Sequence, residues 1–148
     1  MSAQKTILVA DDDSNDIYLL KRAFLKAGID IHMEFVQDGE QVIRYLKGGT
    51  PEAKTPTPEL LLLDLKMPRV NGFEVLEWIR RQPGLKRLLI IVLTSSDEPR
   101  DINRAYDLGA NSYLVKPCSI EHLTGIAEHL YSYWMNINRQ PDCAAKSG

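Results

Sequence analysis

The stretch Leu60-Leu61-Leu62-Leu63-Asp64-Leu65-Lys66-Met67-Pro68 decides the fold class of this chain. A short apolar run without alternating polar residues is typical of a strand that is buried on both faces, as in a parallel sheet covered by helices. Because the run ends at Asp64, we expect this residue at the carboxyl end of the strand. Ligands bind at that edge in open α/β sheets. Asp64 taken alone fits the start of an ordinary loop equally well, so the remaining segments must decide.

The rest of the chain alternates between short apolar runs and helical patterns. The apolar runs predict four further strands, at residues 6–10, 31–36, 88–93 and 113–115. Apolar residues three or four positions apart predict helices near residues 14–28, 42–46, 72–82, 99–109 and 119–138. Ser14 and Ser119 are suited to N-caps, and Pro99 is suited to the first turn of a helix. Strand and helix in repeated alternation predict an α/β fold with a doubly wound, five-stranded parallel sheet of order 2-1-3-4-5 and helices on both faces.

Size and composition indicate one ordinary globular domain. The chain has 148 residues and a formal net charge of −2 at pH 7, which gives no electrostatic reason to expect nucleic acid or an anionic membrane as a partner. No apolar run approaches the roughly 20 residues that a membrane-spanning helix needs, and the polar N-terminus has no signal-peptide pattern. Cys118 and Cys143 lie far apart and form no metal-type spacing. We therefore expect a cytoplasmic protein.

Polar residues follow four of the predicted strands, at the point where each strand ends. They are Asp11 and Asp12 after the first strand, Asp64 after the third, Thr94 after the fourth and Lys116 after the fifth. Because parallel strands end at the same edge of a sheet, we expect these side chains to converge there. Three ionised carboxylates would repel one another by about 4 kcal/mol per close pair at an effective dielectric constant of roughly 20. A hard divalent cation, Mg²⁺ above all, would relieve this repulsion, whereas the lack of His or Cys at matching positions argues against zinc.

These residue types suit phosphoryl transfer. The carboxylate of Asp64 can act as a nucleophile toward phosphorus and form an aspartyl phosphate. Phosphoryl transfer needs mainly positioning and charge neutralisation, which Mg²⁺ and Lys116 would supply to the incoming oxygens. The hydroxyl of Thr94 can donate a hydrogen bond to another of these oxygens. The predicted edge of the sheet is therefore a candidate phosphoacceptor site.

Several sequence elements occur in a defined order and spacing. Thr94 follows Asp64 by thirty residues, and Lys116 follows Thr94 by twenty-two. The elements are Asp11-Asp12, Asp64-x-x-Met67-Pro68-x-x-x-Gly72, Thr94, Tyr113 three residues before the lysine, and Lys116-Pro117. On these elements the sequence resembles the receiver domain of a two-component response regulator, over about residues 6–133. The resemblance implies the flavodoxin-like receiver fold and a histidine kinase as the phosphoryl donor.

The resemblance also implies individual roles at the site. Asp64 would be the phosphoacceptor, and Asp12 and Asp64 would bind the metal directly. Asp11 would bind it through water, and the main-chain carbonyl of Lys66 would complete the protein ligands. The Lys116–Pro117 peptide bond is expected to be cis, a geometry that proline makes accessible.

Thr94 and Tyr113 are expected to form a switch by the same resemblance. After phosphorylation Thr94 would move to bond the new oxygens, and Tyr113 would turn inward into the vacated space. The surface of the fourth helix, the fifth strand and the fifth helix would then change. The simpler alternative is that Tyr113 is only a packed aromatic residue of an edge strand.

The last predicted helix carries more apolar bulk than packing on a sheet requires. Its seam has spacings of three and four residues, which is a heptad pattern, and the simpler interpretation is that this seam packs on the sheet. Tyr131, Tyr133 and Met135 lie off the seam. We therefore expect Tyr131 and Trp134 to contribute to a partner face. The seam residues are Ile120, Leu123, Ala127, Leu130, Trp134 and Ile137.

We assign residues 1–138 to the receiver domain and residues 139–148 to a short polar tail, with no output domain, so that the signal leaves by protein contact. Within the family the chain looks most like the small regulators that partner phytochrome histidine kinases. The long loop at residues 48–59 and the aromatic end of the fifth helix carry this likeness. Members of that group tend to form homodimers through the fourth helix, fifth strand and fifth helix. Chemotaxis-type regulators and phosphorelay intermediates are the alternatives.

Two other classes of function stay open. A phosphatase of the haloacid-dehalogenase type also uses an aspartate nucleophile and Mg²⁺, but it carries a second aspartate two residues later, where this chain has Lys66. A receiver-like docking module would no longer accept phosphate, yet no element of the site is missing here. We therefore expect a signalling domain that catalyses only its own phosphorylation and dephosphorylation, rather than an enzyme.

Overall fold

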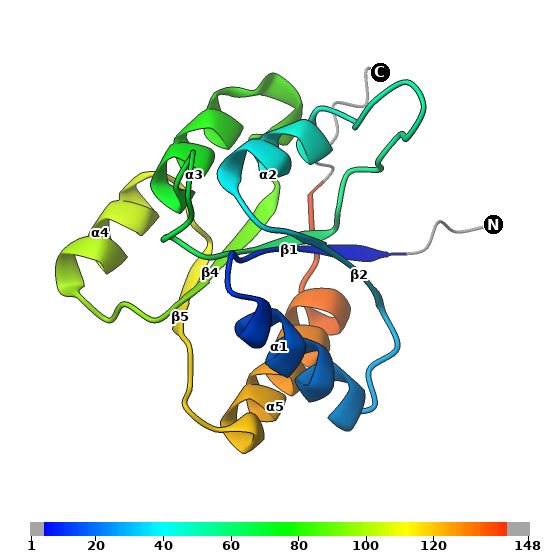
Figure 1. Ribbon diagram of the computed structural model, residues 1–148, viewed down its shortest axis with the longest axis vertical. Coiled ribbons are helices and arrows are strands. Elements are labelled where there is room, and N and C mark those ends of the chain that lie inside the picture. Colours follow the sequence, from blue (N-terminus) through cyan, green and yellow to red (C-terminus); the bar gives the residue numbers. More distant parts are fainter. Residues whose placement is uncertain (1–4, 142–148) are drawn as a thin grey trace.

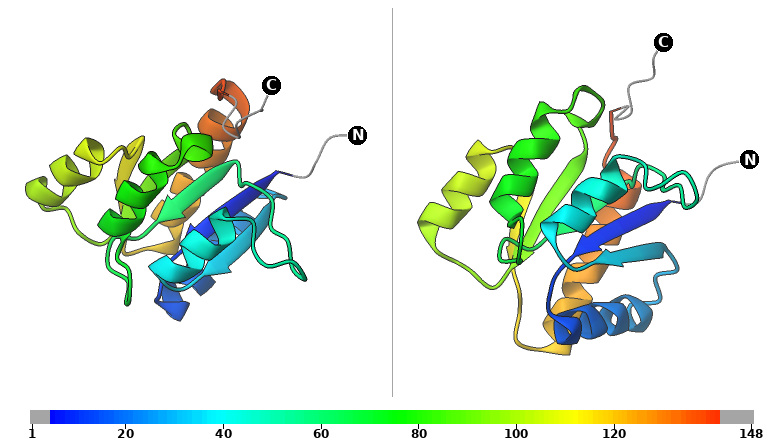
Figure 2. Two further views of the ribbon diagram at one scale, coloured as in Figure 1. Left: turned by 90° about the horizontal axis from the view of Figure 1, so that it is seen from above. Right: turned by 45° about the horizontal axis from the view of Figure 1, so that its top comes forward.

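The computed structural model describes residues 5–141, in which a parallel sheet of five strands lies between two layers of helices (Figures 1 and 2). The strand order is β2-β1-β3-β4-β5 and every neighbouring pair is parallel, which confirms the predicted doubly wound α/β fold. The strands are β1 (Thr6–Ala10), β2 (His32–Val36), β3 (Leu60–Leu63), β4 (Leu89–Thr94) and β5 (Ser112–Val115). The helices are α1 (Ser14–Lys26), α2 (Gly39–Leu46), α3 (Gly72–Arg81), α4 (Pro99–Asp107) and α5 (Ile120–His129). A 3₁₀ turn (Pro83–Leu85) follows α3, and a π-helix (Leu130–Ile137) continues α5.

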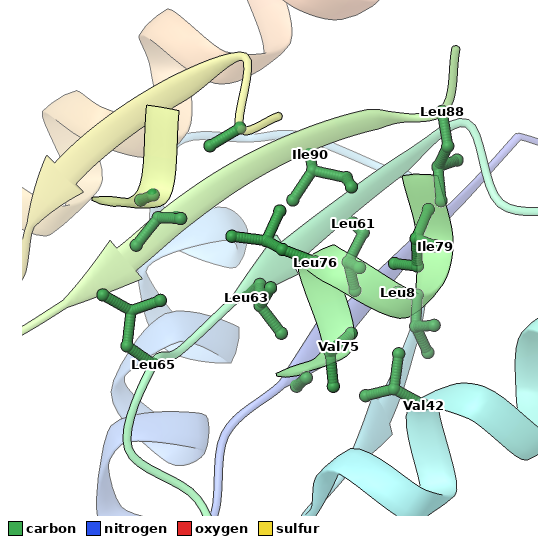
Figure 3. Close-up of a cluster of buried hydrophobic side chains, with 14 of the residues drawn as sticks. Leu8, Val42, Leu61, Leu63, Leu65, Val75, Leu76, Ile79, Leu88 and Ile90 are labelled. Carbon is green, nitrogen blue, oxygen red and sulfur yellow. The ribbon is translucent and has the colours of Figure 1, made fainter. Parts of the chain in front are cut away.

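Side chains that alternate along each strand give the sheet two apolar faces. Leu61 and Leu63 of β3 lie on the face covered by α2, α3 and α4, where they pack with Leu76 (Figure 3). Leu60 and Leu62 lie on the opposite face, which α1 and α5 cover. None of the four leucines is more than 1% exposed. Burial on both faces explains why the leucine run has no polar alternation.

The helices begin close to the predicted positions. Ser119 caps α5 by accepting a hydrogen bond from the main-chain N–H of His122, and Pro99 begins α4, as predicted. The prediction that Ser14 caps α1 is wrong, because the Asp13 side chain accepts from the N–H groups of Asn15 and Asp16. Aspartate and serine are about equally good N-caps, so their order in the sequence cannot distinguish them. Between residues 5 and 141, no helix has the length and apolar character needed to cross a membrane.

The end of the last helix departs from the predicted seam. Leu123, Ala127 and Leu130 are buried, but the next buried residue is Met135, and Ile137 is 68% exposed. From Leu130 onward the backbone is a π-helix, in which hydrogen bonds join residues five positions apart. Because of this wider turn, the buried residue that follows Leu130 is Met135, five positions later. The prediction that the buried seam continues with heptad spacing to Ile137 is therefore wrong.

Gly72 allows α3 to begin directly against the end of β3. Its main-chain N–H donates a hydrogen bond of 2.9 Å to the carbonyl of Leu65. A Cβ atom at this position would lie 2.4 Å from the carbonyl oxygen of Asp64 and 2.7 Å from Leu65 Cα. Asn71 and Glu74 form a reciprocal capping box at the same point. The close approach of these backbones fixes the segment that carries Asp64.

We predict that Gly72→Ala lowers the free energy of unfolding by about 1–3 kcal/mol, because the added methyl group meets backbone atoms that cannot move aside cheaply. Gly125→Ala is the matched control, since a Cβ added there inside α5 would have no atom within 4 Å apart from its chain neighbours and the backbone of its own helix. That change should be neutral or stabilise the protein by up to about 1 kcal/mol, because alanine favours a helix more than glycine does. Urea unfolding measures both, and equal effects of the two substitutions would contradict the packing described for Gly72.

Candidate functional site

Side chains that follow four different strands meet at the carboxyl edge of the sheet. Asp11 follows β1, Asp64 follows β3, Thr94 ends β4 and Lys116 follows β5. Lys116 Nζ lies 2.7 Å from Asp11 Oδ2 and 2.8 Å from Asp64 Oδ2. Thr94 Oγ1 donates a hydrogen bond of 2.8 Å to Asp64 Oδ1. The structure therefore brings these predicted site residues into one connected group.

Asp64 lies at the centre of this group, with both carboxylate oxygens engaged. Oδ1 accepts from the Thr94 hydroxyl and, at 3.3 Å, from the main-chain N–H of Lys66. Oδ2 accepts from Lys116 Nζ. The residue is only 6% exposed, and its own N–H donates to the carbonyl of Ala10 on the neighbouring strand. These contacts fix the carboxylate in one position, which a nucleophile requires.

Asp11, Asp12 and Asp64 form an acidic group that fits a divalent cation. One carboxylate oxygen of each lies within 4.8 Å of the others. Asp11 and Asp64 are buried, whereas Asp12 is exposed. Donors that are all oxygen suit a hard ion such as Mg²⁺. The contact of Lys66 with this group is a hydrogen bond from its main-chain N–H to Asp64 Oδ1. The role of its main-chain carbonyl as a metal ligand stays a prediction.

Burial and hydrogen bonding act in opposite directions on the charged groups of the site. Burial raises the pKa of the Asp11 carboxyl from 3.8 to about 6, although hydrogen bonds from Lys116 and from the N–H of Asp13 oppose the shift. The folded protein thus holds this proton more tightly than the unfolded chain, so ionising Asp11 reduces stability as the pH rises from 3.8 to about 6. Burial alone would lower the pKa of Lys116, but its hydrogen bonds with Asp11, Asp16 and Asp64 outweigh burial and raise that pKa. Lys116 is therefore a stable ammonium among a larger number of acids.

Asp16 is a site residue that the sequence analysis missed. It lies in the first turn of α1, and its Oδ2 is 2.8 Å from Lys116 Nζ. An acid in the first turn of a helix is ordinary, because it interacts favourably with the helix dipole. The one available signal was its position four residues after Asp12, about one helical turn further along the chain.

Tyr113 connects β5 to the loop that follows Thr94. Its hydroxyl donates a hydrogen bond of 2.9 Å to the main-chain carbonyl of Ser96. The buried Ser96 hydroxyl in turn donates to Asp101 Oδ2 at 2.7 Å, in the first turn of α4. The residue predicted as a switch is thus attached to the loop between the site and α4. That attachment is compatible with a switch, whose action stays a prediction.

The prediction of a cis bond between Lys116 and Pro117 is wrong. No cis peptide bond occurs within residues 5–141, so this bond is trans. A trans bond is favoured by about 0.5–1 kcal/mol even before proline, and the expectation came from the family resemblance rather than from local residues. With the trans bond, Lys116 Nζ reaches Asp11, Asp16 and Asp64.

The residues predicted for a partner face have different surroundings. Tyr131 and Trp134 pack partly against the core beneath α1 and α5. Tyr133 is 48% exposed, and its ring meets that of Trp134 edge-on with centroids 5.0 Å apart. A groove of about 310 Å³ lies between this segment and Ser112 and Leu114 of β5. The accessible aromatic residue at this end is therefore Tyr133.

Comparison with known proteins places this arrangement in a family. The model of the response regulator receiver domain matches residues 7–128. The chain is 37% identical over 135 residues to the probable methanogenesis regulatory protein FilR2 of Methanothrix harundinacea, covering 91% of this chain and 86% of FilR2. It is 32% identical over 137 residues to the response regulator Rcp1 of Synechocystis, covering 93% of each protein.

Solved structures show the same likeness. The phosphorylated cyanobacterial phytochrome response regulator RcpA superimposes with a TM-score of 0.86 at 32% identity, covering 94% of this chain and 99% of RcpA. The Mn²⁺-bound form of Rcp1 has a TM-score of 0.82 at 31% identity, covering 93% of this chain and 99% of Rcp1. Because the family model and these relatives each span most of its length, the chain belongs to the family of response regulator receiver domains.

Proposed function

We propose that this chain is a phosphorylation switch in which Asp64 accepts a phosphoryl group from a histidine kinase. The main observation behind this proposal is that Thr94 and Lys116 each donate a hydrogen bond of 2.8 Å to the Asp64 carboxylate. The carboxylates of Asp11 and Asp12 lie beside it. A buried acid with a hydroxyl donor, an ammonium and spare oxygen ligands around it suits phosphoryl transfer. The chain belongs to the receiver family and resembles a regulator whose structure was solved in its phosphorylated form, and both findings support this proposal.

The proposed reaction moves one phosphoryl group between two side chains. An oxygen of the Asp64 carboxylate attacks the phosphorus of a phosphohistidine, and the phosphorus–nitrogen bond breaks with its electron pair going to the imidazole. Lys116 and Thr94 donate hydrogen bonds to oxygens of the transferred group. Asp12 and Asp64 would hold Mg²⁺ directly, Asp11 through water. When bound, the ion neutralises charge on the transferred oxygens.

The proposed structural response to phosphorylation depends on contacts that begin at Thr94 and continue to β5 and α4. If Thr94 turns to a phosphoryl oxygen, the loop that follows it has to adjust, and this loop holds both the Tyr113 hydroxyl and the start of α4. A change of state from 1:99 to 99:1 needs about 5.5 kcal/mol. A few hydrogen bonds to a charged group, at up to about 3 kcal/mol each, supply that amount.

The proposed donor is a histidine kinase of the phytochrome type. RcpA is a phytochrome response regulator, and the chain matches it and Rcp1 over nearly its whole length. FilR2, which is more similar in sequence, is a probable regulator of methanogenesis, so a donor of another input class is the main alternative. Chemotaxis-type and phosphorelay regulators share the same site, and a docking module without phosphorylation is the remaining alternative.

A homodimer through α4, β5 and α5 is the proposed assembly. Exposed apolar side chains at these elements support it, namely Tyr106 of α4 at 47%, Val115 of β5 at 41% and, in the π-helix that continues α5, Tyr133 at 48% exposed. Sedimentation velocity of the phosphorylated protein tests it. A monomer at every concentration would contradict this assembly while leaving the switch itself intact.

We predict that acetyl phosphate with Mg²⁺ adds one phosphoryl group to the wild-type protein, stable in acid and labile in base as an acyl phosphate is. Asp64→Asn should accept none, because it lacks the nucleophilic carboxylate. Asp13→Asn is the matched control, since it removes a nearby exposed charge and an asparagine caps α1 equally well. Intact-mass spectrometry gives the answer. An unmodified but folded wild type, or equal modification of Asp64→Asn, would rule out the proposed acceptor.

We predict that transfer from purified, autophosphorylated histidine kinases of the host is fastest from those of the phytochrome type. Kinases differ in the surface they present to a regulator, so the physiological donor should exceed the others by about tenfold or more in initial rate, which corresponds to about 1.4 kcal/mol in barrier height. Radiolabel transfer at short times measures this. Preference for a kinase of another class would replace the phytochrome assignment, whereas the acceptor role of Asp64 would stand.

A further inference from the structure

The ammonium of Lys116 lies among three carboxylate oxygens: it donates hydrogen bonds to Asp16 and Asp64 and forms an ion pair with Asp11. Nζ lies 2.7 Å from Asp11 Oδ2, 2.8 Å from Asp16 Oδ2 and 2.8 Å from Asp64 Oδ2. An ammonium has three donors and no more. Any further anion that needs a hydrogen bond from Lys116 must therefore displace one of these partners.

The three partners differ in what they lose when they are displaced. The side chains of Asp11 and Asp64 are each 8% exposed, whereas that of Asp16 is 33% exposed. Asp64 is the proposed acceptor, and when it is modified the carboxylate oxygen that does not bind phosphorus remains at the site as a hydrogen-bond acceptor. Asp11 is held further by the N–H of Asp13 at 2.9 Å, and without Lys116 it would be left as a poorly solvated charge. Water can solvate Asp16 in place of Lys116, so Asp16 is the partner that is released at the lowest cost.

A phosphoryl group on Asp64 would bring oxygens that require donors from Thr94 and Lys116. On this basis, which rests on the proposed function, we propose that Asp16 competes with the phosphoryl group for Lys116. The ammonium exchanges Asp16 for a phosphoryl oxygen when Asp64 is phosphorylated. Asp16 thereby weakens the phosphorylated state, and it acts through Lys116 as a positioning residue rather than as a catalytic one.

The test uses beryllofluoride, which mimics a phosphoryl group on Asp64 without a covalent bond. Calorimetric titration at saturating Mg²⁺ compares the wild type with Asp16→Asn and Asp13→Asn. Removing the competitor should make Asp16→Asn bind about tenfold more tightly, the effect of one hydrogen bond to a charged group. Asp13→Asn makes the same change in net charge three residues away, has no contact with Lys116 among the described residues, and should stay within about twofold of the wild type.

Repeating the titrations at high salt separates competition from simple charge repulsion. Repulsion by a partly exposed carboxylate is screened by salt, whereas a direct contact with Lys116 is lost in Asp16→Asn at any salt concentration, so the tenfold ratio should persist. An unchanged or weaker affinity of Asp16→Asn, or a ratio that falls to one at high salt, would overturn the inference. If the folded wild type binds no beryllofluoride, the proposed function fails as well; if only the Asp16→Asn effect is absent, this inference fails alone.

Discussion

The ammonium of Lys116 is the interaction on which the rest of the site depends. It lies within 2.8 Å of carboxylates from two strand ends and from the first turn of α1. Removing one partner from a buried ion pair typically costs about 3–5 kcal/mol, because the other charge is left uncompensated. One ammonium cannot neutralise Asp11, Asp12, Asp16 and Asp64 together, so the site keeps an excess of negative charge. This excess of negative charge fits a site for a divalent cation.

The fold brings these carboxylates together and connects them by direct contacts to α4 and β5. Strands that are buried on both faces place their polar residues at the ends, and parallel pairing brings those ends to one edge. Gly72 keeps the segment after Asp64 tight against α3, so the acid has little freedom to move away. Thr94 is hydrogen-bonded to Asp64, and the loop after Thr94 holds both Tyr113 and the start of α4. A change at one carboxylate therefore has a continuous set of contacts through which it can reach α4 and β5.

The sequence was sufficient for the sheet and for most of the site, because both follow from where apolar runs end. The leucine run gave the position of Asp64, and the topology of parallel strands then required Asp11, Thr94 and Lys116 to share its edge. The contact of Asp16 with Lys116 could not be obtained in this way, because it depends on how α1 docks on the sheet.

The sequence does not predict the π-helix either, because a change in hydrogen-bond spacing leaves no clear mark in apolar periodicity. The heptad spacing therefore leaves Met135 off the buried seam, although the structure buries it. Asp13 and Ser14 are adjacent, and both residue types are good N-caps. The sequence alone therefore does not show which of the two caps α1.

We propose that the carboxylates at this edge of the sheet are crowded enough to bind a divalent cation. The most direct measurement is the free energy of unfolding in urea with EDTA and with increasing Mg²⁺. We expect the free energy to rise with Mg²⁺ concentration, by about 1.4 kcal/mol when the ion is at ten times its dissociation constant. Asp12→Asn, which removes the exposed acid of the group, should fold normally but show a much smaller rise. Equal stability of the wild-type protein in EDTA and in saturating Mg²⁺ would show that these carboxylates do not bind the ion.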